Sequence, residues 1–92
     1  MIEQRVVVTN RLGLHARAAA QLVRMANSFQ SMLRLERMDG SGSADAKSIL
    51  SVLMLAASRG TELRLAAEGA DEREAVRALS QLFACGFGEL EE

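Results

Sequence analysis

Apolar positions recur along this chain with two periods, one typical of strands and one typical of helices. Residues 5–9 are rich in β-branched side chains, and residues 32–36 and 62–66 alternate apolar with polar side chains, as half-buried strands do. Residues 16–27 and 71–83 instead place apolar side chains at positions i, i+3, i+4 and i+7, the spacing of a helix with one buried face. The pattern therefore predicts three strands and two amphipathic helices.

Two shorter elements complete the predicted order. Ser48 is followed by an apolar run, which indicates a third helix over residues 48–55. Residues 40–45 are the candidate for a fourth strand, paired with residues 32–36 through a turn at "MDGSG". The order is then βαββαβα, and alternating strands imply one polar and one apolar sheet face. We therefore expect a two-layer α/β sandwich, with a mostly antiparallel sheet covered on its apolar face by the helices.

Length and composition restrict the class of protein. The 92 residues, 49% hydrophobic and 25% charged, suit a single domain over residues 1–92. A net charge of -1 and the lack of Trp and Tyr argue against nucleic-acid binding. No apolar run approaches the roughly 18–20 residues that span a bilayer, and the start "MIEQRVVVTN" lacks the pattern of a signal peptide. We expect a cytoplasmic monomer that inserts in no membrane.

The chain contains one cysteine, Cys85, and one histidine, His15. A single cysteine excludes an internal disulfide, and one histidine leaves zinc without its usual nitrogen partners. We therefore expect no metal and no cofactor. Cys85 itself is expected to pack as a small apolar residue near the end of the last helix.

The stretch "RLGLHARAAA", residues 11–20, places His15 where a turn runs into an alanine-rich helix. Gly13 permits an unusual backbone conformation just before it, so His15 is expected at or near the N-cap. The free backbone N–H groups of Ala16, Arg17 and Ala18 and the helix dipole would favour an unprotonated ring nitrogen and a nearby anion. The Arg17 guanidinium matches phosphate oxygens. No acidic partner accompanies these residues, so the site is suited to receiving a phosphoryl group and passing it on.

The segments "NRLGLHARAAAQLV" and "ADAKSILSVLMLAASRGTELRLAAEG" resemble the HPr family, the histidine phosphocarriers of the bacterial phosphotransferase system. The resemblance extends over nearly the whole chain and implies four antiparallel strands under three helices. It also implies that His15 accepts the phosphoryl group at Nδ1 and that Arg17 assists the transfer. Ala18 stands where family members usually have proline, which gives up some preorganisation of the first helical turn but supplies an N–H group.

Ser48, in "AKSIL", has two interpretations. Serine is common as an ordinary N-cap. In some members of the family, however, the matching serine is phosphorylated by a dedicated kinase, HPr kinase/phosphorylase, and a helix N-terminus tolerates the added charge. The sequence leaves both open.

The helix after Ser48 carries more apolar residues than one buried face requires. Val52 and Leu55 are expected in the core. By resemblance to the family, Ile49, Leu50 and Leu53 instead belong to an apolar docking surface for partner proteins near His15. This docking surface would consist of Ala20, Ile49, Leu50 and Leu53, with Arg24 and Lys47 as a basic rim.

The resemblance implies a carrier rather than an enzyme. Phosphoenolpyruvate-dependent enzyme I would phosphorylate His15, and a IIA-type protein would accept the group. The alternative is a regulatory protein that binds a transcription factor or an enzyme through the same surface, with Ser48 as its switch. "LMLAASRG" and "LFACGFG" favour the nitrogen-related branch, whereas "AKSIL" favours a kinase-regulated sugar branch, and the sequence does not decide between them.

Overall fold

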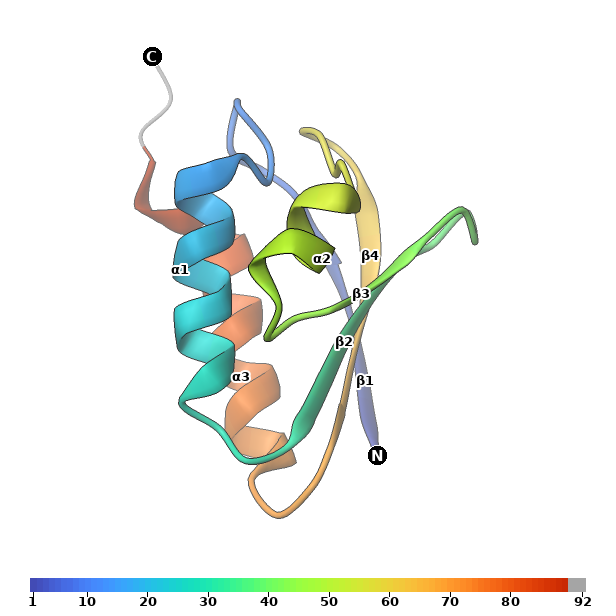
Figure 1. Cartoon of the computed structure of the whole chain (residues 1–92), viewed down its shortest axis with the longest axis vertical. Coiled ribbons are helices and arrows are strands. Elements are labelled where there is room, and N and C mark those ends of the chain that lie inside the picture. The colour runs from blue at the N-terminus through green and yellow to red at the C-terminus, as the bar shows by residue number, and fades with distance from the viewer. Residues whose placement is uncertain (90–92) are drawn as a thin grey trace.

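One face of a four-stranded antiparallel sheet is covered by three helices in the computed structural model, which describes residues 1–89 (Figure 1). The predicted βαββαβα order is confirmed. The elements are β1 (Ile2–Val7), α1 (Ala16–Asn27), β2 (Met32–Arg37), β3 (Ser43–Asp45), α2 (Ile49–Met54), β4 (Glu62–Glu68), α3 (Glu72–Ala84) and a short turn, η1 (Gly86–Gly88). The expectation that residues 1–92 form one domain includes residues 90–92, which lie outside the described part.

The last strand in sequence, β4, lies inside the sheet, whose order is β1-β4-β2-β3. Leu65 is paired with Gln4 of β1 on one side and with Leu35 of β2 on the other. Alternate residues of β4 are buried, namely Leu63, Leu65 and Ala67. This period of two gives the sheet one apolar face for the helices and one polar face, as the sequence predicts.

The core lies between the sheet and the two longer helices. Helix α1 buries Ala18, Ala19, Leu22 and Ala26, and helix α3 buries Ala75, Val76, Leu79 and Phe83. The many alanines let α1 approach its neighbours closely, because a small side chain occupies little space between two elements. The predicted bounds of α1, residues 16–27, are confirmed.

Other boundaries differ from the prediction for identifiable reasons. Strand β1 covers Ile2–Val7 rather than residues 5–9, because its pairing with β4 already begins at Ile2 opposite Ala67. The fourth strand is confined to Ser43–Asp45, because Asp39 accepts hydrogen bonds from both the N–H and the hydroxyl of Ser41 and so closes a turn before it. No helix within residues 1–89 is long and apolar enough to cross a membrane.

The prediction for Cys85 was wrong, since this residue is exposed. It is the C-cap of α3, where the chain turns away from the helix axis. The core positions on either side of it are taken by Phe83 and Phe87, whose rings meet edge to face with centroids 5.1 Å apart. Because these two aromatic side chains fill the core next to the end of α3, the Cys85 thiol remains exposed.

Candidate functional site

His15 is the N-cap of α1, as predicted, with an extended backbone (φ -75°, ψ 180°). Its carbonyl accepts the first helical hydrogen bond, from the N–H of Ala19 at 2.8 Å. Its side chain makes no capping hydrogen bond, so the N–H groups of Ala16, Arg17 and Ala18 receive no acceptor from it. The first-turn N–H groups therefore lie beside the imidazole ring without being capped by it.

The loop before His15 is pressed against the segment that follows α2. The N–H of Leu14 donates to the carbonyl of Ala57 at 2.9 Å. Gly13 has φ +69°, and a Cβ placed on it would lie 2.6 Å from that same carbonyl oxygen. Only glycine satisfies both conditions, because other residues rarely adopt this φ and would collide with Ala57. The close approach fixes where His15 begins the helix.

The residues predicted to handle the phosphoryl group lie together around the first turn of α1. The Arg17 side chain is 71% exposed, while His15 is 24% exposed. Ala18 is fully buried against the core, so the alanine in place of the family's usual proline also contributes to packing. An exposed guanidinium can move to meet an anion at the helix start.

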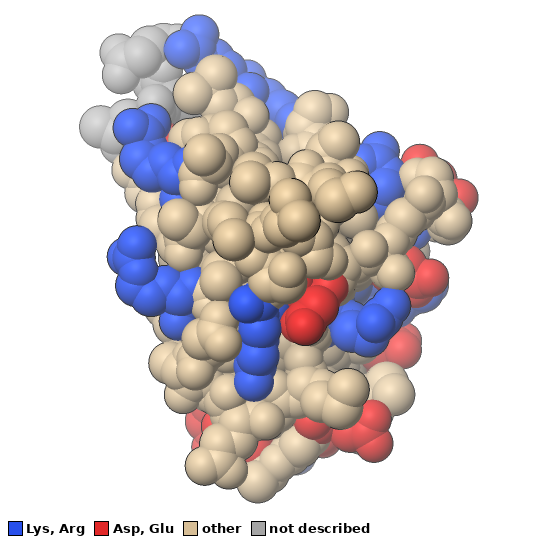
Figure 2. Space-filling view, viewed as in Figure 1, with Lys and Arg blue, Asp and Glu red and all other residues tan. Residues whose placement is uncertain are grey.

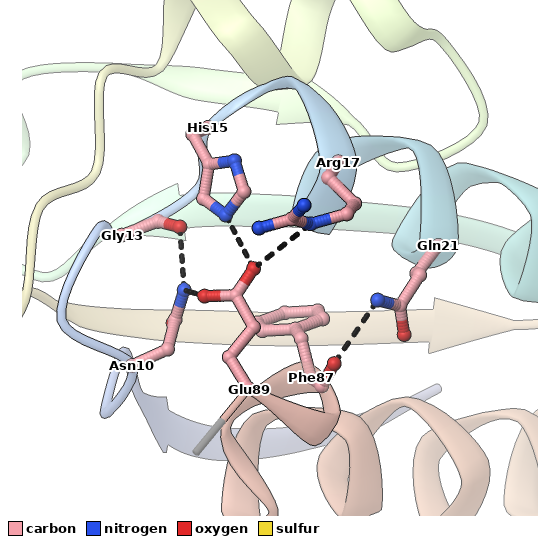
Figure 3. Close-up of polar contacts among 7 residues, drawn as sticks. All are labelled: Asn10, Gly13, His15, Arg17, Gln21, Phe87 and Glu89. Carbon is pink, nitrogen blue, oxygen red and sulfur yellow. Dashed lines mark hydrogen bonds and ion pairs between the residues drawn. The ribbon is translucent and has the colours of Figure 1, made fainter. Parts of the chain in front are cut away.

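The expectation that His15 has no acidic partner was wrong. Figure 3 shows the Glu89 carboxylate reaching His15 from the far end of the chain. Oxygen Oε2 contacts His15 Nε2 and lies 3.7 Å from Arg17 Nε. Oxygen Oε1 accepts a hydrogen bond from Asn10 Nδ2 at 2.9 Å. The site is therefore built from both ends of the sequence.

Electrostatics keep this carboxylate ionised. The hydrogen bond from Asn10 is the largest cause that lowers the pKa of Glu89 below its usual value, and the contact with His15 and the charge of Arg17 lower it further. Burial opposes this shift. At neutral pH, Glu89 therefore acts as an acceptor only.

Glu89 and Asn10 are the site residues that sequence reasoning missed. Asn10 is separated from His15 by one short turn, and its Nδ2 also donates to the Gly13 carbonyl at 2.7 Å. Glu89 lies 74 residues beyond His15. The available signal was the sequence "GFGE", in which two glycines allow a sharp reversal that brings the glutamate back to α1.

The predicted docking surface lies on α2 and the adjacent side of α1. Ile49, Leu50 and Leu53 are 41%, 65% and 38% exposed, whereas Val52 and Leu55 are buried, as predicted. Figure 2 shows an uncharged area over α2, with Lys and Arg groups beside it over α1. The remaining predicted members are Ala20, which is half-buried, and Arg24, which is exposed.

Lys47 and Ser48 lie at the end of this surface that is remote from His15. The Lys47 ammonium donates to the Phe29 carbonyl at 2.8 Å, just beyond the C-terminus of α1. Ser48 is the N-cap of α2, and its hydroxyl accepts a hydrogen bond from the Ser51 N–H at 3.3 Å. The structure therefore brings together His15, Arg17 and the first turn of α1. Lys47, with Ser48 next to it in the chain, lies instead at the opposite end of α1, where its carbonyl also accepts a hydrogen bond from Asn27 Nδ2 at 3.1 Å.

An open-faced sandwich with a histidine at a helix start defines a class of small carrier proteins, and comparison with known proteins agrees. A family model described as the PTS HPr component phosphorylation site matches residues 2–84. The chain belongs to the HPr family of the phosphotransferase system, and it is a phosphoryl carrier rather than a catalytic enzyme. Membership of this family implies enzyme I and IIA proteins as partners.

Individual relatives cover almost the whole chain. Phosphocarrier protein HPr of Xylella fastidiosa (strain 9a5c) is 47% identical over 97% of this chain and 98% of its own length. Phosphocarrier protein NPr of Proteus mirabilis (strain HI4320) is 42% identical over 94% of each. A crystal structure of HPr from Thermoanaerobacter tengcongensis superposes with a TM-score of 0.92 at 40% identity, covering 99% of this chain and 100% of that one.

Proposed function

We propose that His15 accepts a phosphoryl group at Nδ1 from phosphorylated enzyme I and passes it to a IIA-type protein in the cytoplasm. The observation that carries this proposal is the orientation of the ring. Nε2 is engaged by Glu89, while Nδ1 lies on the side of the first turn of α1 (Figure 3). The Nδ1 lone pair is therefore the nucleophile.

The reaction needs little from this chain beyond position and charge. The Nδ1 lone pair forms a bond to phosphorus while the bond from phosphorus to its donor on enzyme I breaks. The N–H groups of Ala16, Arg17 and Ala18 and the Arg17 guanidinium supply donors for the phosphoryl oxygens. In the second half of the relay, a IIA nucleophile takes the group and His15 is restored.

The direct test is reconstitution of the relay. The purified protein is mixed with labelled phosphoenolpyruvate, the enzyme I of each branch from its own organism, and each IIA protein. We expect label on this chain and then on one IIA protein, and the faster pair identifies the sugar or the nitrogen branch. Relatives named HPr and NPr both match this chain closely, so the transfer rates have to decide. A chain that binds enzyme I without acquiring label would instead favour the purely regulatory alternative.

The docking surface gives a prediction about partner affinity. Leu50→Glu is expected to weaken binding to enzyme I about tenfold or more, because it places a charge in an apolar interface. Met32→Glu is the matched control, since Met32 is exposed to a similar degree (69%, against 65% for Leu50) but lies on the polar face of the sheet. Isothermal titration measures both affinities. Equal losses in the two variants would refute the docking surface.

Ser48 supports a second, regulatory proposal. It lies at the edge of the docking surface, and a phosphate there would place negative charge beside Ile49 and Leu50 and oppose docking of an acidic partner. A kinase of the HPr kinase/phosphorylase type would be the enzyme that adds it. The fold should persist, because a helix N-terminus tolerates an anion.

Ser48→Asp tests this regulation. We expect unchanged circular dichroism and about tenfold slower phosphorylation by enzyme I when the protein is limiting, with the defect shrinking as its concentration rises. Ser48→Ala removes the hydroxyl cap without adding charge and serves as the control. If both variants react at the wild-type rate, Ser48 is only a helix cap.

A further inference from the structure

We propose that Glu89 is a positioning residue for His15. Its carboxylate accepts a hydrogen bond from Nε2–H and so keeps the lone pair on Nδ1. The proposal rests on the phosphoryl-carrier function argued above, and it assigns to the C-terminal segment a role in the chemistry. The contact itself joins Glu89 Oε2 to His15 Nε2, with Glu89 only 16% exposed.

The turn η1 places the Glu89 side chain next to His15. Three successive residues, Gly86, Phe87 and Gly88, have φ of 63°, 58° and 73°, so the chain makes a left-handed reversal directly after α3. Phe87 adopts a conformation that non-glycine residues avoid, which requires support from its surroundings. That support is present, because its ring is buried and its carbonyl accepts a hydrogen bond from Gln21 Nε2 at 3.0 Å. The hydrogen bond from Gln21 therefore holds the turn η1 against α1.

Asn10 fixes the orientation of the carboxylate. Its side chain is almost fully buried, and its Nδ2 donates both to Glu89 Oε1 at 2.9 Å and to the Gly13 carbonyl at 2.7 Å. One carboxylate oxygen therefore faces an amide donor and the other faces Nε2. An unprotonated Nε2 would bring two lone pairs together, so the favourable state has the proton on Nε2.

This arrangement also suits the change of charge during transfer. When Nδ1 bonds to phosphorus and the donor bond breaks, the proton stays on Nε2 and the ring becomes positively charged. The Glu89 carboxylate stabilises that charge, as a buried carboxylate does for a catalytic imidazole. When the phosphoryl group leaves for the acceptor, the P–N bond breaks and the ring returns to the neutral form with its proton still on Nε2.

Glu89→Gln is the test, because a carboxamide has one acceptor and one donor facing the two donors of Asn10 and His15. In long-range ¹H–¹⁵N NMR spectra of the free protein at alkaline pH, we expect wild type to show one tautomer with a slowly exchanging Nε2–H. In Glu89→Gln this signal should exchange rapidly and the other tautomer should appear. Glu74→Gln, on an exposed part of α3, is the control and should resemble wild type.

The rate of phosphoryl transfer to His15 should fall when the other tautomer is populated. We expect the rate constant for phosphorylation at saturating enzyme I to fall about tenfold in Glu89→Gln, with KM unchanged; this is the lower end of the effect of removing a carboxylate that orients a metal-binding histidine. Glu89→Asp retains a carboxylate and should recover part of both readouts.

Two results would overturn the proposal: an Nε2–H signal in Glu89→Gln that matches wild type, or an unchanged rate constant. Failure of the wild-type protein to be phosphorylated is distinguishable from either, because the NMR comparison uses the free protein. That failure would refute the carrier function, and with it the role of Glu89 in transfer, whereas the NMR result still decides whether Glu89 sets the tautomer.

Discussion

The His15→Ala variant is expected to take up no label from phosphoenolpyruvate and enzyme I. His15 is the only histidine of the chain, and it is the N-cap of the helix whose first-turn amides and arginine would bind the phosphoryl oxygens. In wild type, the label should be lost in acid and retained in base, as expected for a phosphoramidate. Scintillation counting after gel electrophoresis measures both the loss in the variant and the stability of the bond in wild type.

The same variant should remain folded, which separates chemistry from stability. The His15 side chain makes no capping hydrogen bond, and within residues 1–89 its one polar contact is with Glu89. Circular dichroism and enzyme I binding should therefore resemble those of wild type. Undiminished label in a folded His15→Ala protein would show that another residue accepts the phosphoryl group.

The Gly13→Ala substitution should cause the largest loss of stability among the changes considered. The left-handed conformation at this position costs alanine about 1–2 kcal/mol relative to glycine. In addition, the alanine Cβ would lie 2.6 Å from the Ala57 carbonyl oxygen and 2.9 Å from Ser58 Cα. Both contacts are with backbone, so the loop has to shift. We expect the free energy of unfolding to fall by roughly 3 kcal/mol or more, measured by urea denaturation.

Gly40→Ala provides a matched control for the clash. Gly40 has a similar φ of +78°, but a Cβ there would meet nothing within 4 Å. The Gly40→Ala substitution should therefore lower the free energy of unfolding by only about 1–2 kcal/mol, from the backbone conformation alone. Equal losses at the two positions would mean that the approach of the His15 loop to Ala57 contributes nothing to stability.

Local patterns were sufficient to predict most of the fold. The bounds of α1 follow from its apolar spacing and from the glycine before it, and both are local in sequence. The edges of β1 and β3 were missed because strand ends depend on pairing with distant partners. Ile2 pairs with Ala67, and no pattern within the first ten residues encodes that register.

Only the part of the candidate site that is local in sequence could be predicted. His15, Arg17 and the helix amides lie within four consecutive residues, so their proximity is certain once the helix is recognised. Glu89 comes to His15 only through the left-handed turn and the packing of Phe87, which are tertiary effects. Cys85 was misplaced because its burial depends on which neighbouring side chain the core accepts.

The position of β4 inside the sheet has a consequence for how the chain folds. Of the three strand pairings in the described residues 1–89, only that between β2 and β3 joins neighbours in sequence, whereas β4 has to pair with both β1 and β2. Closing such long loops costs entropy before the contacts form, which slows folding. During synthesis, the first strand stays unpaired until residues 62–68 have left the ribosome, so the nascent sheet exposes open edges for most of translation.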